Sequence, residues 1–282
     1  MLCDRQTNKV YFSEGLQKYK RICSSLLDSL RREDIPYEFL PYTESEKHVW
    51  ARDFMPVQLE EGIFLQYVYS PDYLKDCKEF IPDYPAICKE LKLECIKTDI
   101  VLDGGNVIKC GNKVIMTYKI FQENPGKTKE ELTQKLEKLL DARLIIIPWD
   151  KYEMFGHADG MVRAIGENKV LLNNYIDFDP YLRQRLLKSL SPHFEVEELH
   201  YGIKGGCKFS WAYLNFLQIK NCIFVPGFGV KEDDLALEQI QKLFPDHKAV
   251  QIGNCADLAK EGGALNCISW NIIVNNLQEY EI

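Results

Sequence analysis

The sequence predicts an α/β fold, and three observations support this prediction. Short runs of β-branched and aromatic residues alternate along the chain with segments of amphipathic helical periodicity. Hydrophobic residues make up 46% of the 282 residues and aromatic residues 12%, which is enough apolar surface for a sizeable core. No linker rich in proline, glycine and serine divides the sequence, so we expect a single domain over residues 1–282.

The strands are expected where short apolar runs lie between helical segments or turn residues. In chain order, the expected strands are residues 10–12, 62–68, 99–102, 113–116, 144–147, 169–173, 223–225 and 249–252.

The helices are indicated by capping residues that precede a stripe of leucines. Thr128 and Glu131 form a capping box, and leucines at helical spacing follow it. Proline in the first turn and acidic residues near the N-terminus give similar signals elsewhere. The expected helices are residues 14–32, residues 128–141, a helix opened by Asp179-Pro180, and one that runs from Asp233-Asp234 to before Pro245.

Five polar clusters recur at nearly constant intervals. Their anchors are Asp53, Asp103, His157, Asn215 and Cys267, and the intervals are 50, 54, 58 and 52 residues. A period of this size predicts five similar supersecondary units around an axis, each of which brings a loop to one central site.

Composition excludes several classes of function. The formal net charge is −7, from 35 basic and 42 acidic residues, which disfavours a nucleic-acid partner. No apolar run approaches the roughly 20 residues that a membrane span requires, and we expect no signal peptide. None of the ten cysteines forms a Cys-x-x-Cys pair, so we expect reduced thiols in the cytoplasm and no zinc site.

One cysteine stands in a loop that can present a thiol. Cys267 follows Gly262-Gly263 closely and precedes a short apolar run. A single cysteine in such a place is more often a buried, inert thiol than a nucleophile. The interpretation therefore depends on the other motifs.

A histidine and an aspartate two residues apart are candidates for an acid-base role and a binding role. His157 and Asp159 are two residues apart, which on an extended segment directs both side chains to one face. A catalytic imidazole and a binding carboxylate can thus share one wall, although a loop with an unrelated His and Asp is the simpler alternative.

The remaining motifs are weaker one by one. Arg52-Asp53 can be an ordinary surface pair, and residues 103–106 can be a plain Gly-Gly turn that directs Asp103 and Asn106 inward. In the aromatic stretch 210–216 we expect core packing for every residue except Asn215.

Together, the motifs resemble those of the agmatine deiminase and bacterial peptidylarginine deiminase family, whose members modify guanidino groups. The resemblance rests, in order, on residues 50–56, 103–106, 156–163, 213–216 and 262–267, and it extends over about residues 45–275. It implies the pentein fold, a five-bladed pseudo-symmetric α/β propeller with repeated strand-strand-helix-strand units.

The resemblance also implies roles for individual residues. Cys267 is the expected nucleophile, His157 the general acid and base, and Asp53 and Asp159 the carboxylates that hold the guanidinium. For Arg52 and Arg163, ion pairs with carboxylates of the site are the alternative to substrate contact. The substrate-binding set that we predict is Asp103, Asn106, Asn215, Trp50, Arg52 and Arg163.

The sequence departs from the family's usual pattern at three positions. Members usually have glutamate where this chain has Asp103. Around the nucleophile they commonly have three glycines and a His-Cys pair, whereas here Glu261 takes the first glycine position and Asn266 precedes Cys267.

Physical chemistry supports this assignment. A guanidinium pairs bidentately with carboxylates, and a thiolate is a far better nucleophile than water toward its delocalised carbon. The expected product is a ureido compound plus ammonia, formed through a covalent thiouronium, with no metal and no organic cofactor.

Two other functions remain open. An amine can resolve the same intermediate, which gives an amidinotransferase, or the chain is a non-catalytic guanidine-binding relative. The expected partner is a small guanidino compound, agmatine before arginine or a peptidyl-arginine end. We expect no membrane partner, and apolar surface strands allow a homodimer.

Overall fold

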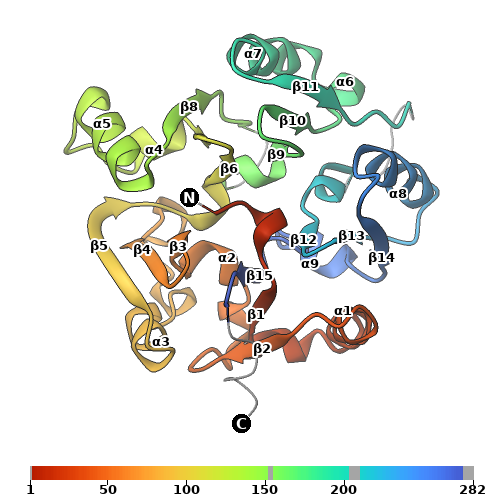
Figure 1. Ribbon diagram of the computed structural model, residues 1–282, viewed down its shortest axis with the longest axis horizontal. Coiled ribbons are helices and arrows are strands. Elements are labelled where there is room, and N and C mark those ends of the chain that lie inside the picture. Colours follow the sequence, from red (N-terminus) through yellow and green to blue (C-terminus); the bar gives the residue numbers. More distant parts are fainter. Residues whose placement is uncertain (1, 152–154, 203–209, 276–282) are drawn as a thin grey trace.

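Five three-stranded sheets surround a central axis in the computed structural model, which describes residues 2–151, 155–202 and 210–275 (Figure 1). In each sheet the first strand runs antiparallel to the central strand, and the third runs parallel to it. We call each sheet with its crossover helices a blade. The five-bladed propeller expected from the resemblance is confirmed.

The strands fall into three sets by their place in the blade. The first strands are β15 (Ser269–Ile272), β3 (Val57–Glu60), β6 (Ile108–Cys110), β9 (Val162–Ala164) and β12 (Leu217–Ile219). The central strands are β1 (Lys9–Ser13), β4 (Ile63–Val68), β7 (Lys113–Thr117), β10 (Lys169–Leu172) and β13 (Cys222–Pro226). The third strands are β2 (Tyr37–Leu40), β5 (Glu94–Val101), β8 (Arg143–Ile147), β11 (Glu195–Glu198) and β14 (Lys248–Ile252).

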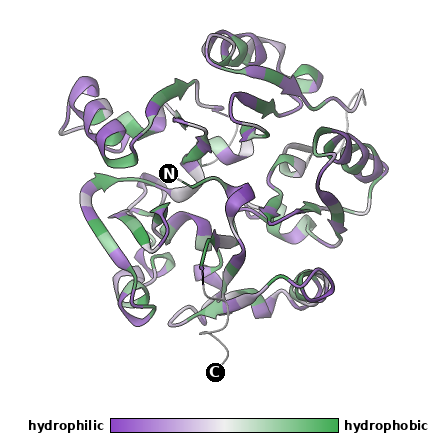
Figure 2. Ribbon diagram, in the orientation of Figure 1, coloured by the Kyte–Doolittle hydropathy of each residue, from purple (hydrophilic) through white to green (hydrophobic). Residues whose placement is uncertain are grey.

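Helices cover the outside of the ring because a parallel pair of strands needs a crossover connection. These helices are α1 (Lys20–Arg32), α3 (Tyr84–Glu90), α4 (Lys119–Gln122), α5 (Lys129–Leu140), α6 (Tyr175–Phe178), α7 (Pro180–Leu190) and α8 (Glu232–Leu243). Figure 2 shows hydrophilic and hydrophobic residues interleaved along them, as is typical of amphipathic helices. In the described part of the chain, no helix is long and apolar enough to cross a bilayer.

The two ends of the described chain close the ring. Strand β15 pairs antiparallel with β1, with Tyr11 opposite Trp270. The indole of Trp270 packs against Tyr11 and Phe64, with ring centroids 5.3 and 5.6 Å away, and its Nε1 donates to the Pro56 carbonyl at 2.8 Å. One buried side chain thus ties the closing blade to the next one.

Most expected elements are found. A strand covers each of the eight expected runs, and Thr128 and Asp179 cap α5 and α7 as expected. The helix expected over residues 14–32 is wrong at its start, because Glu14–Lys18 is a 3-10 helix and Tyr19 breaks the helical path. Hydrogen bonds from Glu14 and Gly15 to Thr43 replace helical ones there.

Truncation of Trp270 should destabilise the whole ring. We expect Trp270→Ala to lower the free energy of unfolding by about 3–5 kcal/mol, because the change leaves a large cavity in the core. Denaturant unfolding would measure it. The matched control is Tyr181→Ala, whose ring is 72% exposed and whose effect should stay within about 0.5 kcal/mol. Equal losses in the two variants would contradict this account of ring closure.

Candidate active site

The connections between blades carry the five polar motifs. Each connection ends in a short helical segment before the first strand of the next blade. These segments are α2 (Ala51–Phe54), the 3-10 helices Gly104–Asn106, Ala158–Gly160 and Ser210–Leu214, and the turn after α9 (Ala256–Lys260) that leads to β15. Consecutive segments contact one another, so residues about fifty positions apart meet at the axis.

The thiol of Cys267 lies against a carboxylate. Its Sγ donates to Asp159 Oδ2 at 3.3 Å, and the same oxygen accepts from Asn215 Nδ2 at 3.0 Å and from Asn266 Nδ2 at 2.7 Å. Asn215 also holds the turn that bears the thiol, because its Oδ1 accepts from the backbone N–H groups of Ala264 and Cys267 at 3.1 and 3.2 Å. The two amides and Asp159 therefore set the position of the sulfur.

Burial keeps this thiol protonated. Cys267 is 6% exposed. Burial raises the pKa of its thiol well above the ordinary value, and the charges of Asp159 and Asp53 raise it further. The hydrogen bonds from Ala264 and Asn215 counteract only part of this effect. In the absence of a cation, the group is a neutral thiol at physiological pH.

His157 lies between two carboxylates. Its Nε2 is 2.7 Å from Asp103 Oδ2, and its Nδ1 is 3.6 Å from Asp53 Oδ1. Burial alone would lower the pKa of the imidazole, but Asp53 and Asp103 outweigh burial and raise that pKa to about 10. The ring is therefore an imidazolium at neutral pH. Aspartate, although shorter than the family's usual glutamate, reaches the imidazole.

A buried lysine supports Asp103 from behind. Lys119, on α4, is 1% exposed, and its Nζ lies 3.3 Å from Asp103 Oδ2, 3.1 Å from Glu123 Oε1 and 3.4 Å from Asp72 Oδ1. Burial opposes its charge, yet Asp103 and Glu123 raise the pKa of the ammonium. Lys119 and His157 thus both hold Asp103 ionised, and the pKa of Asp103 is lowered despite its burial.

Gly105 leaves room where the three polar groups face one another. A methyl group there would lie 2.7 Å from Asp53 Oδ1, 2.9 Å from His157 Nδ1 and 3.3 Å from Asp159 Oδ1. The Gly105 N–H donates to Asp53 Oδ1 at 3.0 Å. Burial and the nearby charges of Asp103 and Asp159 nevertheless raise the pKa of Asp53 to about 7.

Aromatic rings pack over the nucleophile loop. Gly262 has a φ of +93°, and a side chain there would collide with Phe155, while one at Gly263 would collide with the Trp50 ring. Phe155 in turn packs on Tyr73, with centroids 4.8 Å apart. The paired glycines therefore allow two aromatic rings to close against the loop that bears Cys267.

Three predicted binding residues do not join this cluster. Asn106 turns its Oδ1 to the backbone N–H of Thr117, at 2.9 Å. Arg52 and Arg163 extend to Asp4 instead, with Nη1 of Arg52 3.9 Å from Oδ1 and Nη2 of Arg163 2.8 Å from Oδ2. Ion pairing was the expected alternative for both arginines, but their partner is Asp4 rather than a carboxylate of the cluster.

Sequence reasoning missed several members of the site. Neither Lys119 nor Tyr73 belongs to any of the five sequence motifs. The sequence shows that Asn266 precedes Cys267, but it does not show that the Asn266 side chain hydrogen-bonds to Asp159.

Cys207 lies outside the described residues, and the nine described cysteines are free thiols. No group of His, Cys, Asp and Glu within the described ranges has the arrangement of a metal site.

Comparisons with known proteins agree on one family. A model of the Porphyromonas-type peptidyl-arginine deiminase family matches residues 13–272. A provisionally named agmatine deiminase of Enterococcus faecalis is 28% identical, over 84% of this chain and 78% of that protein. One of Mycoplasma mycoides is 26% identical over 65% of this chain, and the match spans 60% of that relative's length.

A solved structure shows the same fold. A C. jejuni agmatine deiminase variant with substrate bound superposes with a TM-score of 0.74 over 97% of this chain and 96% of that one, at 18% sequence identity. An identity this low shows a shared architecture and nothing finer.

The charge on His157 can be tested by its titration. We expect the imidazole to remain protonated at pH 8 and to lose its proton near pH 10. Asp103→Asn should lower that pKa by roughly 1–3, because it removes the nearest negative charge. Histidine NMR would follow both proteins, with Asp99→Asn, an exposed carboxylate 64% accessible, as the control that leaves His157 unchanged.

The positive charge on His157 also makes the free energy of unfolding depend on pH. The folded-state pKa lies above the unfolded value of about 6.5, so the stabilisation is fully present below pH ~6.5 and is lost as pH rises toward 10. An imidazole that titrates near 6.5 in the unmodified protein would refute the arrangement described here.

Proposed function

The chain belongs to the Porphyromonas-type peptidyl-arginine deiminase family, and from this premise we propose that it hydrolyses the guanidinium group of a small guanidine, with Cys267 as nucleophile. Agmatine is the first candidate because the provisionally named relatives carry that activity in their names. The observation that carries the proposal is the 3.3 Å contact between Cys267 Sγ and Asp159, beside His157 and Asp53.

The charges of the cluster favour a bound cation. Asp53, Asp103, Asp159 and Glu123 contribute four carboxyl groups, whereas His157 and Lys119 contribute two cations. A buried carboxylate without a partner of opposite charge destabilises the protein, and the raised pKa of Asp53 is a sign of this unbalanced negative charge. A guanidinium between Asp53 and Asp159 would supply the missing positive charge and offer donors to both.

The surroundings suit the shape of the substrate. Gly105 provides a flat floor between the two carboxylates, and Asn266 Oδ1 is buried without a hydrogen-bond partner among the described residues. That oxygen can accept a guanidinium N–H. The rings of Tyr73 and Phe155, whose centroids lie 6.1 and 5.9 Å from that of His157, can pack against the alkyl chain that follows.

Substrate binding would also activate the thiol. Burial and two carboxylates keep Cys267 protonated in the free protein. A guanidinium placed against Asp159 and Asp53 brings one positive charge next to the sulfur and offsets part of the effect of the two carboxylates, which lowers the thiol pKa. The nucleophile thus forms only when its electrophile is in place.

The chemistry follows in two halves. The Cys267 thiolate attacks the central carbon, and the Nδ1–H of imidazolium His157 donates its proton to the departing nitrogen, which leaves as ammonia. The neutral imidazole then takes a proton from water. That water attacks the thiouronium carbon, and the C–S bond breaks to release the ureido product. The proton of the added hydroxyl passes to the sulfur, which restores the thiol that lost its proton to solvent on substrate binding.

Asp103 and Lys119 act on this sequence through His157. Asp103 fixes the Nε2 side of the ring, so that Nδ1 faces the substrate. Lys119 keeps Asp103 ionised. Asn215 positions the sulfur through the turn rather than through the substrate. The substrate contacts proposed here belong to Asp53, Asp159 and Asn266.

Loss of the nucleophile should abolish turnover. We expect native protein to release ammonia and a ureido product from agmatine, with less from arginine and from blocked arginine peptides. Cys267→Ala should lower kcat at least about 1000-fold, since it removes covalent catalysis altogether. Ammonia release and mass spectrometry of the product would measure it.

The matched control is a second buried cysteine. Cys255→Ala removes a thiol that is equally buried but hydrogen-bonds to the Ile252 carbonyl, away from the cluster, and it should keep near-native kcat. A new guanidine formed only when an amine is added would indicate amidino transfer. Binding without turnover of any guanidine would indicate a non-catalytic relative.

Filling the floor of the site should block binding without unfolding the protein. Gly105→Ala places a methyl group within 2.9 Å of both Asp53 and His157, where the guanidinium plane is proposed to lie. We expect kcat/KM to fall about 100-fold or more, as a displacement of about 1 Å can cause. Gly126→Ala, where a methyl group meets open space, is the control. Unchanged kinetics in Gly105→Ala would place the substrate elsewhere.

A further inference from the structure

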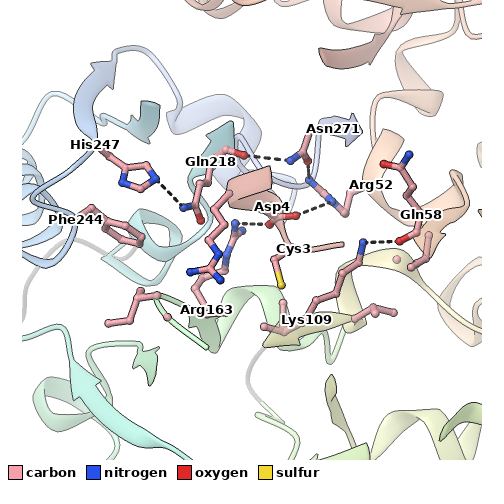
Figure 3. A pocket seen from close by; sticks show the side chains of 18 of the residues that line it. Cys3, Asp4, Arg52, Gln58, Lys109, Arg163, Gln218, Phe244, His247 and Asn271 are labelled. Atoms are coloured by element: carbon pink, nitrogen blue, oxygen red, sulfur yellow. Dashed lines mark hydrogen bonds and ion pairs between the residues drawn. The ribbon is translucent and has the colours of Figure 1, made fainter. Parts of the chain in front are cut away.

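A polar cavity lies among the first strands of the five blades, beside the segments that carry the active site (Figure 3). We call it the axial cavity. Its volume is about 200 Å³, and the first strand of every blade contributes one polar residue to its lining. These equivalent residues are Gln58, Lys109, Arg163, Gln218 and Asn271. Two of the five are cations and none is a carboxylate, and the Gln58 amide is bound by the backbone of Ile273.

A third cation enters the axial cavity from the active-site segment. Arg52 stands next to Asp53 on α2, yet its guanidinium extends to the opposite side, where it bonds to Asn271 Oδ1. Asp4, from the N-terminal 3-10 helix, lies between Arg52 and Arg163 (Figure 3). Three cations therefore face one inward carboxylate, because the two other charged residues of the lining, Arg5 and Asp246, are exposed.

Asp4 leaves part of this positive charge unsatisfied. It accepts from Nη2 of Arg163 at 2.8 Å, but Nη1 of Arg52 is 3.9 Å away, beyond hydrogen-bond length. Nη1 of Arg163 is buried and has no hydrogen-bond partner among the described residues, and the whole side chain is only 2% exposed. The guanidinium also stacks on the Phe216 ring, with Cζ 4.6 Å from the ring centroid. A buried guanidinium N–H without an acceptor is costly, so Asp4 alone does not satisfy this side chain.

Lys109 adds to the excess of positive charge in the axial cavity. Its Nζ donates to the Gln58 carbonyl at 3.2 Å, a neutral acceptor. Burial lowers the pKa of its ammonium to about 8 and the charge of Arg52 acts in the same direction, while Asp4 offsets part of both effects. A second negative charge in the axial cavity would offset more.

We propose that the axial cavity is a binding site for a small oxyanion, held by Arg163, Arg52 and Lys109. Guanidinium groups bind phosphate and carboxylate oxygens through paired N–H donors, and lysine adds a point charge. A cavity of about 200 Å³ has room for a phosphate or a short carboxylate.

The site is separate from the substrate cluster but shares its scaffold. The backbone N–H of Arg52 donates to the Cys267 carbonyl at 3.0 Å, and its Nε lies 3.4 Å from the Asn266 carbonyl. Gly104 lines the axial cavity, while Gly105 forms the floor of the active site. The oxyanion would therefore contact, from behind, the same segments that hold the nucleophile.

Direct binding to the full chain tests the proposal without any assay of activity. Isothermal titration with inorganic phosphate, and separately with acetate, would be run at constant ionic strength in chloride. We expect saturable binding of one anion per chain, and the stronger of the two probes identifies the oxyanion class. Lys109→Gln should weaken binding about ten-fold through loss of a charge-assisted contact.

Asp4→Asn should have the opposite effect and tighten binding, because it removes the carboxylate that competes for Arg163 and Arg52. Two variants reproduce the same charge changes outside the axial cavity. These controls are Lys138→Gln for the lysine and Glu130→Gln for the carboxylate, both exposed on α5. Thermal melting would confirm that each variant is folded.

The binding measurements can support or overturn the proposed oxyanion site. Opposite shifts in Lys109→Gln and Asp4→Asn, with neither control changed, support the axial site. No saturable binding of either probe would overturn it. Equal shifts in each variant and its control would also overturn it, because they would indicate a general response to net charge.

Discussion

The structure depends on how five polar segments share one buried axis. Ring closure through β15 and β1 carries Asp53, Asp103, His157, Asp159 and Cys267 into a region where water is largely excluded. Charges in such a place need partners of opposite sign. The imidazolium lies between two of the carboxylates for this reason, and Lys119 lies buried behind Asp103. Every unusual pKa in the cluster follows from this single constraint.

The same segments give the two sides of the axis opposite charge. Arg52 and Asp53 are neighbours in the chain, yet the carboxylate faces the cluster with His157 and the guanidinium faces the axial cavity. Asp159 and Arg163 repeat the division in another blade. The active-site cluster has an excess of negative charge, and the axial cavity has an excess of positive charge. A guanidinium and an oxyanion are the ligands that would complete them.

Much of the fold could be predicted because local signals and tertiary structure agree. The leucine stripe and caps of α5 require no distant partner, and central strands such as β13 are apolar on both faces. First strands such as β6 and β12 have only three residues, and their pairing is set by the neighbouring strand. The places of Lys119 and Arg52 also depend on the tertiary fold, since adjacent residues can point to opposite sides of a segment.

The environment of Cys267 connects recognition with reactivity. A thiol beside two carboxylates is a poor nucleophile, which at first sight argues against catalysis. The same carboxylates are what a guanidinium needs, and its positive charge offsets their effect on the thiol pKa. A neutral analogue, or water alone, would bring no such charge and would leave the thiol protonated. On the proposed function, the charge of the substrate is therefore part of the catalytic apparatus, and selectivity for cations follows from the electrostatics of the empty site.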